Sequence, residues 1–85
     1  MKKVTIYSTP ICPYCVKAKQ LFSSLDVEYK DVDISADMSL RDELVKKYNW
    51  QTVPMIFVGE EFIGGFDDVA KLHAEGSLMD MIKSV

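Results

Sequence analysis

Two residues separate the only two cysteines of this chain, in the segment Cys12-Pro13-Tyr14-Cys15. The segment directly follows a short apolar stretch and begins a pattern typical of an amphipathic helix. A C-x-x-C at such a junction, in a chain without a secretory signal, indicates a thiol–disulfide redox site. Both sulfurs would lie on the first helical turn, close enough to form a disulfide. The spacing therefore predicts reversible disulfide chemistry.

The expected position of Cys12 at the helix N-terminus favours its thiolate form. N–H groups of a first helical turn lack intrahelical acceptors and, with the helix dipole, stabilise a negative charge. Pro13 fits the first helical position, because its φ angle is already helical and it has no N–H group to satisfy. Free thiols have a pKa of about 8.5, and C-x-x-C motifs lower such values to about 3.5–7.5. Cys12 is therefore a candidate nucleophile.

Two other uses of the cysteine pair remain open. A structural disulfide would close so short a loop that it constrains the unfolded chain little, and a reducing cytosol would keep it open. A structural zinc ion takes four ligands, and apart from the pair the chain offers only His73 and carboxylates. We therefore favour redox chemistry and expect no metal site within a single chain.

The composition indicates one small domain spanning residues 1–85. Hydrophobic residues make up 48% of the chain, which is enough for one packed core without disulfide cross-links. The formal net charge of −3 argues against a nucleic-acid-binding surface, which needs a concentrated basic patch. No apolar run approaches the length of a membrane span. We expect a monomeric, cytoplasmic protein without membrane association.

Hydrophobic periodicity predicts the elements that position the cysteine pair. β-Branched and aromatic residues indicate strands over 4–7 and 27–32, and the continuous apolar run over 53–58 indicates a central strand buried on both faces. A helix over 13–25 is expected between the first two strands, because its apolar residues recur at helical spacing. These residues are Ala18, Leu21, Phe22 and Leu25.

Cap and turn residues predict the remaining elements. Ser39, with Asp42 three residues later, indicates a capping box at the start of a second helix. The turn Gly59-Glu60 leads into a short strand over 61–64. The expected order is β-α-β-α-β-β-α, an α/β fold in which a mixed four-stranded sheet carries helices on both faces.

The end of the chain is expected to be helical. Asp67 or Asp68 can cap a third helix, which Gly76 would end. Ser77 can cap a last turn or two. The apolar residues expected to face inward there are Leu78, Ile82 and Val85.

Three segments, in their order and spacing, resemble the glutaredoxin family. They are Cys12-Pro13-Tyr14-Cys15 after the first strand, Thr52-Val53-Pro54 before the third, and Gly64-Gly65-Phe66-Asp67-Asp68 after the fourth. The resemblance covers essentially the whole chain, and the three segments together are far more specific than C-x-x-C alone. It implies a thioredoxin-like fold, glutathione as cosubstrate without a further cofactor, and reduction of glutathione mixed disulfides and protein disulfides.

The resemblance also implies a role for each matching residue. Cys12 would be the nucleophile and Cys15 the resolving thiol. The peptide bond before Pro54 would be cis, and the backbone of Val53 would pair with the cysteine unit of glutathione. The γ-glutamyl end would lie at the start of the third helix, where N–H groups bind a carboxylate. The implied glutathione-binding residues are Tyr14, Thr52, Val53, Pro54, Gly65, Phe66, Asp67 and Asp68.

The chain departs from the family three residues before the nucleophile. Many glutaredoxins carry a lysine there that contacts the glycine carboxylate of glutathione, whereas this chain has Thr9. Lys19 either restores part of the positive potential or is a solvated helix lysine. Gln51 either binds that carboxylate as a neutral donor or is a loop residue, and Trp50 either shapes the rim of the site or covers the core.

Two alternative functions stay open. The missing lysine leaves open the first, and the second is implied by the resemblance, because some glutaredoxins bind an iron–sulfur cluster. One is a glutaredoxin-like electron donor that thioredoxin reductase, instead of glutathione, reduces. The other is a metal-binding module, in which Cys12 of two chains and two glutathione thiols hold a 2Fe–2S cluster. Pro13 argues against the cluster, because proline stiffens the turn.

Overall fold

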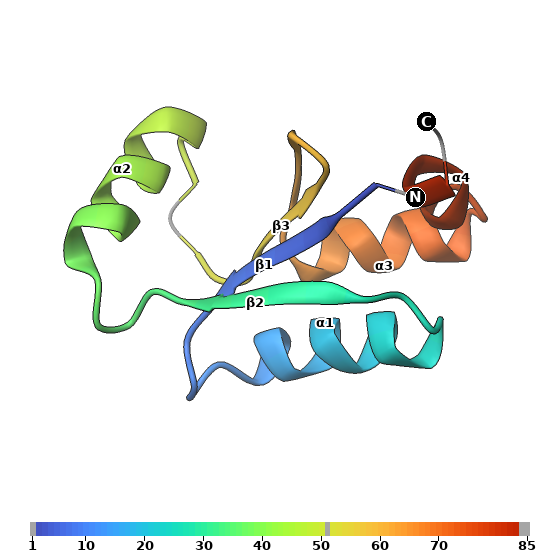
Figure 1. Ribbon diagram of the computed structural model, residues 1–85, viewed down its shortest axis with the longest axis horizontal. Coiled ribbons are helices and arrows are strands. Elements are labelled where there is room, and N and C mark those ends of the chain that lie inside the picture. The colour runs from blue at the N-terminus through green and yellow to red at the C-terminus, as the bar shows by residue number, and fades with distance from the viewer. Residues whose placement is uncertain (1, 51, 84–85) are drawn as a thin grey trace.

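The computed structural model describes residues 2–50 and 52–83, and these form a four-stranded sheet with four helices (Figure 1). The strand order is β2-β1-β3-β4, in which β2 runs parallel to β1 while β3 runs antiparallel to both β1 and β4. The predicted mixed sheet and order of elements are therefore confirmed. The elements are β1 (Val4–Ser8), α1 (Pro13–Ser24), β2 (Tyr29–Asp33), α2 (Met38–Tyr48), β3 (Met55–Val58), β4 (Glu61–Gly64), α3 (Phe66–Ala74) and α4 (Leu78–Lys83).

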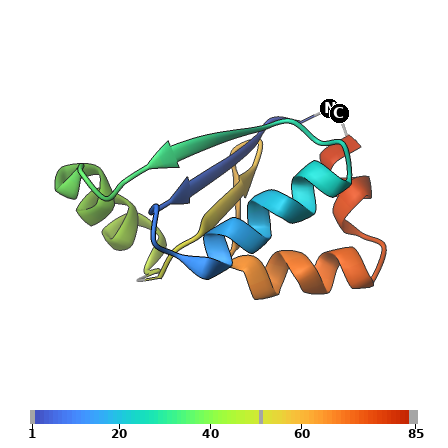
Figure 2. The ribbon, with the colours of Figure 1, turned by 90° about the horizontal axis from the view of Figure 1, so that it is seen from below.

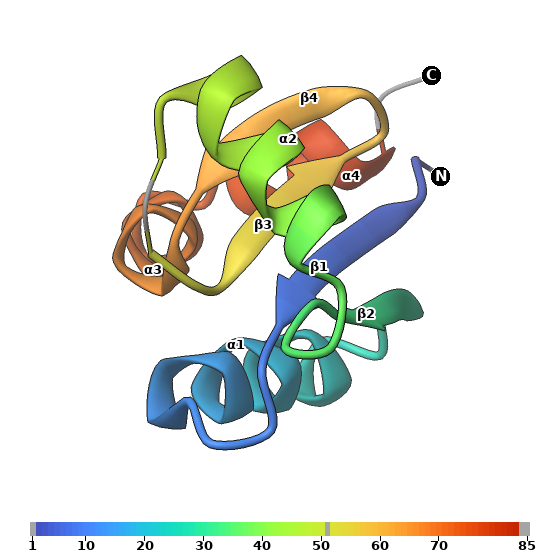
Figure 3. The same cartoon turned by 90° about the vertical axis from the view of Figure 1, so that its left-hand side faces the viewer.

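Helices cover both faces of the sheet, as predicted. On one face α1 and α3 lie side by side (Figure 2), and with α4 they bury the larger core cluster. On the other face α2 lies across β1 from α1 (Figure 3), and Leu44 packs there against Met55 and Phe57. Because β3 lies between β1 and β4 and contributes to both clusters, all four of its residues are buried. The larger cluster contains Val4, Ile6, Ala18, Phe22, Val27, Ile56, Val58, Val69, Leu78 and Ile82.

Two predicted helix caps are wrong. α2 begins at Met38 instead of after Ser39, because the Asp37 carboxylate accepts a hydrogen bond from the Leu40 amide at 3.0 Å. An aspartate two residues upstream is as good a cap as the serine and lets Ser39 join the first turn. α3 begins at Phe66 with Gly65 as its N-cap, so neither Asp67 nor Asp68 is the N-cap residue.

Two strands are shorter at their starts than predicted. β2 begins at Tyr29, because the Val27 amide instead donates to the Phe22 carbonyl at 3.0 Å and closes the end of α1. β3 begins at Met55, directly after a cis peptide bond between Val53 and Pro54. The cis bond that the family resemblance implied is therefore present.

The C-terminal elements follow the prediction. Gly76 has a φ angle of 79° and donates to the His73 carbonyl at 3.1 Å, which ends α3 as a C-terminal glycine does. Leu78 and Ile82 are fully buried on α4. Val85 lies outside the described residues. Across 2–50 and 52–83, no helix has the length and apolar character needed to cross a membrane.

Candidate redox site

Cys12 is the N-cap residue of α1. Its backbone is extended, with φ −90° and ψ 113°, and Pro13 occupies the first helical position as expected. The Cys15 amide points back and donates a hydrogen bond to Sγ of Cys12 at 3.3 Å. A helix N-terminus with a donor at the sulfur favours a negative charge there. The geometry therefore places the Cys12 sulfur at a helix N-terminus beside a backbone donor, as the sequence predicts.

Cys15 lies in the opposite environment, although it is one turn away. It is fully buried, whereas Cys12 is half-buried, and both are free thiols. Burial, followed by the hydrogen bond with Cys12, raises the pKa of Cys15 to about 12. The Thr9 backbone and the Lys19 ammonium act against that rise. Cys15 is therefore protonated at neutral pH.

The loop before β3 lies against the nucleophile. The Cys12 thiol donates to the Val53 carbonyl at 3.5 Å across 41 residues of sequence, and the next peptide bond, to Pro54, is the cis bond. The starts of α1 and α3 flank this loop (Figure 2). Three separate segments of the chain thus meet within reach of the Cys12 sulfur.

A cavity of about 290 Å³ lies where these segments meet. All eight residues that the family resemblance implied for glutathione line it, so the structure brings the predicted set together. Tyr14 and Phe66 both line it, with ring centroids 6.3 Å apart and ring planes tilted by 35°. The lining residues are Tyr14, Trp50, Thr52, Val53, Pro54, Gly65, Phe66, Asp67 and Asp68.

Trp50 is the lining residue that the sequence left undecided. Its ring stacks edge-on against Phe62, with centroids 5.4 Å apart, and approaches Gly65 so closely that a Cβ there would lie 3.3 Å from the ring. Trp50 therefore belongs both to the cavity wall and to the core under α2. Its position two residues before Thr52 is the one sequence signal for this role.

Asp68 has a structural role that limits its part in binding. Its Oδ2 atom accepts a hydrogen bond from the Gly65 amide at 3.0 Å, which closes the first turn of α3. Gly64 has a φ angle of 132°, and a Cβ there would collide with the Asp68 carboxylate. Asp67 is exposed at the same helix end and lines the cavity.

The residues tied to the departure from the family lie in different places. The Thr9 carbonyl accepts from the Cys12 amide at 3.4 Å, so Thr9 lies beside the nucleophile. Lys19 does not line the cavity but pairs with Asp31 at 2.7 Å. Gln51 lies outside the described residues.

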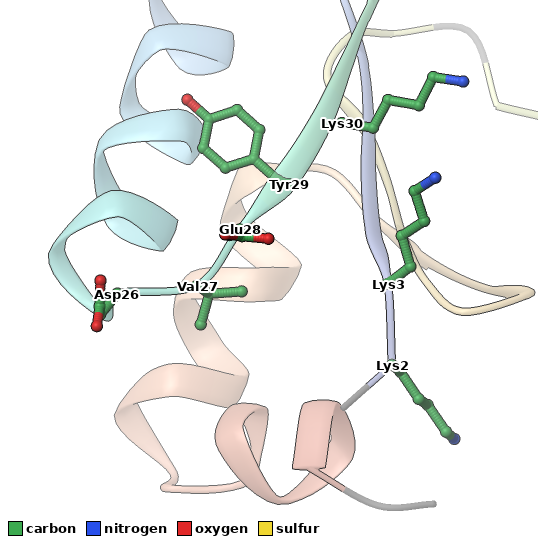
Figure 4. Close-up of a pocket in the computed structure, with 7 residues that line it drawn as sticks. All are labelled: Lys2, Lys3, Asp26, Val27, Glu28, Tyr29 and Lys30. Atoms are coloured by element: carbon green, nitrogen blue, oxygen red, sulfur yellow. The ribbon is translucent and has the colours of Figure 1, made fainter.

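A larger cavity, of about 610 Å³, lies at the other end of the sheet (Figure 4). This cavity lies near the starts of β1 and β2, whereas the two cysteines follow the end of β1. Its wall contains positively and negatively charged side chains but no cysteine. Tyr29 points from it toward α1 (Figure 4). Its lining residues are Lys2, Lys3, Asp26, Val27, Glu28, Tyr29 and Lys30.

A reactive thiol pair at the start of α1, on a thioredoxin-like sheet, defines the class of protein as a thiol–disulfide oxidoreductase. A family model described as glutaredoxin matches residues 4–63, and the chain belongs to the glutaredoxin family. It is 40% identical to glutaredoxin 3 of Escherichia coli over 83 residues, covering 98% of this chain and 100% of that protein. It is 41% identical to a glutaredoxin of Pseudomonas aeruginosa, over 92% of this chain and 93% of that one.

Solved structures agree with the fold. A crystal structure of a buckwheat glutaredoxin–glutathione complex superposes with a TM-score of 0.89, at 29% identity, over 93% of this chain and 74% of that one. Among residues 2–50 and 52–83, no group of three or more His, Cys, Asp or Glu side chains lies in an arrangement that could hold a metal ion.

Proposed function

We propose that this protein uses glutathione as cosubstrate and reduces glutathione mixed disulfides and protein disulfides through Cys12 and Cys15. The observation that carries the proposal is the cavity of about 290 Å³ whose wall includes Val53, the residue whose carbonyl accepts a hydrogen bond from Cys12. It joins an aromatic wall, a loop backbone and a helix N-terminus, which together suit a short, extended, charged peptide. We further propose that the protein acts as a monomer in the cytoplasm.

The cysteine unit and the γ-glutamyl end of glutathione have matching groups along this cavity. The Val53 carbonyl, already within 3.5 Å of the Cys12 sulfur, is a backbone partner for the cysteine unit. The γ-glutamyl carboxylate suits the first-turn N–H groups of α3, and the exposed Asp67 suits the ammonium group beside it. Asp68 contributes less to binding, since it already accepts from Gly65. Tyr14 and Phe66 supply an apolar side.

The reaction is two successive thiol–disulfide exchanges. The Cys12 thiolate attacks one sulfur of the substrate disulfide, and the other sulfur leaves as a thiolate that takes a proton from water. Cys12 is then in a mixed disulfide. For a protein substrate, Cys15 loses its proton and attacks the Cys12 sulfur, which releases the second substrate thiol and leaves a Cys12–Cys15 disulfide. For a glutathionylated Cys12, a second glutathione attacks the glutathione sulfur of the mixed disulfide, so that glutathione disulfide forms and Cys12 is released as a thiolate.

A coupled assay tests the proposal. The protein is given a glutathione mixed disulfide together with glutathione, glutathione reductase and NADPH, beside a parallel reaction that contains thioredoxin reductase alone. We expect turnover with the glutathione system and none with Cys12→Ser. Turnover with thioredoxin reductase alone would favour the electron-donor alternative. A brown protein that binds iron and sulfide with glutathione would favour the cluster alternative.

Binding can be measured apart from turnover. Trp50 is the only tryptophan of the chain and lines the cavity, so its fluorescence reports on occupancy. S-methylglutathione cannot exchange disulfides, and we expect it to change this fluorescence with saturation. No change, in a protein that still reduces disulfides, would contradict glutathione binding at this cavity.

A further inference from the structure

A polar network ties α1 to the sheet on the Cys15 side of the helix. Asp31, at the middle of the edge strand β2, accepts a hydrogen bond from the Ser8 hydroxyl at the end of β1. Its other oxygen pairs with Lys19 Nζ at 2.7 Å. The Ser8 side chain is buried, and the Lys19 side chain is only 25% exposed. The Asp31 side chain is 39% exposed, so the ion pair lies at the solvent-facing edge of the sheet, where it holds the ammonium of Lys19 against β2.

Lys19 and Cys15 share one face of α1. They are four residues apart, the spacing at which helical side chains are neighbours. Cys15 is fully buried on that face, which raises the pKa of its thiol, and the ammonium of Lys19 acts against that rise. The other groups acting on this pair are Cys12, the Thr9 backbone, Asp31 and Tyr29. Among all of these, Lys19 is the cation.

We propose that Lys19, positioned by Asp31, activates Cys15 for the resolving step by stabilising the thiolate that forms as Cys15 attacks the mixed disulfide on Cys12. The proposal rests on the dithiol function above and deepens it. Lys19 touches neither substrate nor the cavity, so it acts as a positioning residue through electrostatics. Asp31 accepts no proton in this scheme, because both of its oxygens are already engaged by Lys19 and Ser8.

The step balances as an ordinary exchange. The Cys15 proton goes to water as the Cys15 sulfur bonds to the Cys12 sulfur, and the bond from Cys12 to the substrate sulfur breaks. The leaving substrate thiolate carries the electron pair away. In this step the substrate sulfur is reduced and Cys15 is oxidised, while Cys12 remains in a disulfide. A cation beside Cys15 favours the charged form needed for attack on an otherwise buried thiol.

One reagent separates this proposal from the function it rests on. An aromatic disulfide with a coloured thiolate product, mixed in equimolar amount with the reduced protein, releases colour in two phases. The first phase is attack by Cys12, and its absence would contradict the proposed function. The second phase is attack by Cys15, and it alone tests the role of Lys19. Circular dichroism verifies that each variant is folded.

We expect Lys19→Met to slow the second phase by about three- to tenfold at neutral pH, as for a partly exposed charge interaction. Its pH profile should move to higher pH while the first phase keeps its rate. Lys19→Arg should restore the second phase. The control Lys30→Met removes the same charge from the exposed residue beside Asp31 and should leave both phases unchanged. An unchanged second phase in Lys19→Met would overturn the proposal, and so would Lys19→Arg being as slow as Lys19→Met.

Asp31→Asn distinguishes Lys19 from a proton acceptor. Asparagine keeps an oxygen for Lys19 but removes the opposing charge, so the positive potential at Cys15 increases. We expect a second phase at least as fast as in the unmodified protein. A second phase as slow as in Lys19→Met, with Lys19 still present, would overturn the proposal, because the cation alone would then not activate Cys15.

Discussion

The Cys15 amide donates to Sγ of Cys12 over 3.3 Å, while the Cys15 side chain turns into the core. The backbone of Cys15 therefore provides a donor for the Cys12 sulfur, while its own sulfur is buried. The two-residue spacing produces this difference, since it places Cys12 at the N-cap, outside the first turn, and Cys15 within it. The thiols of one motif are thereby suited to different steps.

Single cysteine variants should separate the two steps. We predict that Cys12→Ser abolishes all turnover, because only Cys12 combines exposure with the helix N-terminus. Cys15→Ser should keep reduction of glutathione mixed disulfides and lose most reduction of protein disulfides, which needs a resolving thiol. Rates with a glutathionylated peptide and with a disulfide-bonded protein measure the two activities. Equal loss of both activities in Cys15→Ser would contradict this division.

Burial of Cys15 predicts a stability loss at alkaline pH. Its pKa rises from the ordinary value of 9.0 to about 12 on folding, so the unfolded chain releases this proton first. The stabilisation is complete below about pH 9 and is lost as the pH rises toward 12. Within that window the slope approaches about 1.4 kcal/mol per pH unit for one proton.

The measurement is the free energy of unfolding in denaturant, under reducing conditions, at several pH values from about 8 to about 11. Cys15→Ser is the control, because serine does not titrate there. We expect the stability of the unmodified protein relative to Cys15→Ser to fall as the pH rises. A constant difference across this range would show that the thiol titrates normally in the fold.

The sequence predicted the architecture and the members of the site because both depend on patterns along the chain. The apolar spacing of Ala18 and Phe22 fixes which face of α1 is buried, and both are fully buried. The family motifs likewise identified eight of the nine cavity residues. Patterns within one segment were therefore sufficient to predict the features that depend on that segment alone.

Features that depend on contacts between distant segments could not be predicted. Trp50 lies in the cavity wall because Phe62 and Gly65 pack against it, and no spacing links these residues. The Lys19–Asp31 pair joins α1 to β2 and depends on the register of β2 beside β1. The start of α2 was predicted wrongly for a different reason, because Asp37 and Ser39 are both good cap residues.

The corrected cap of α2 gives a stability prediction. Asp37→Ala removes the side chain that accepts from Leu40, so we expect a loss of about 1 kcal/mol in the free energy of unfolding. Ser39→Ala is the matched control, and its effect should stay within about 0.5 kcal/mol, as for an ordinary surface position. Denaturant unfolding of both variants at neutral pH measures the difference. If Ser39→Ala lost more unfolding free energy than Asp37→Ala, Ser39 would be the cap residue, as the sequence predicted.

Thr9 gives the last prediction, since it stands where the resemblance to the glutaredoxin family implied a lysine and its carbonyl accepts from the Cys12 amide. In Thr9→Lys, a cation would lie beside both the Cys12 thiolate and the glycine carboxylate of a bound glutathione. We expect a lower KM for the glutathionylated substrate and faster alkylation of Cys12 at mildly acidic pH. The gain should be about 1 kcal/mol or less for a partly exposed pair, and it should shrink as salt screens the charge.

Thr9→Met is the control for this variant, because it adds a long side chain without the charge. Steady-state kinetics at low and high salt, together with alkylation rates, compare the two variants. If the charge acts as argued, only Thr9→Lys improves and only at low salt. Equal behaviour of the two variants at low salt would mean that the glycine carboxylate is held away from position 9, and it would favour reduction by thioredoxin reductase over reduction by glutathione.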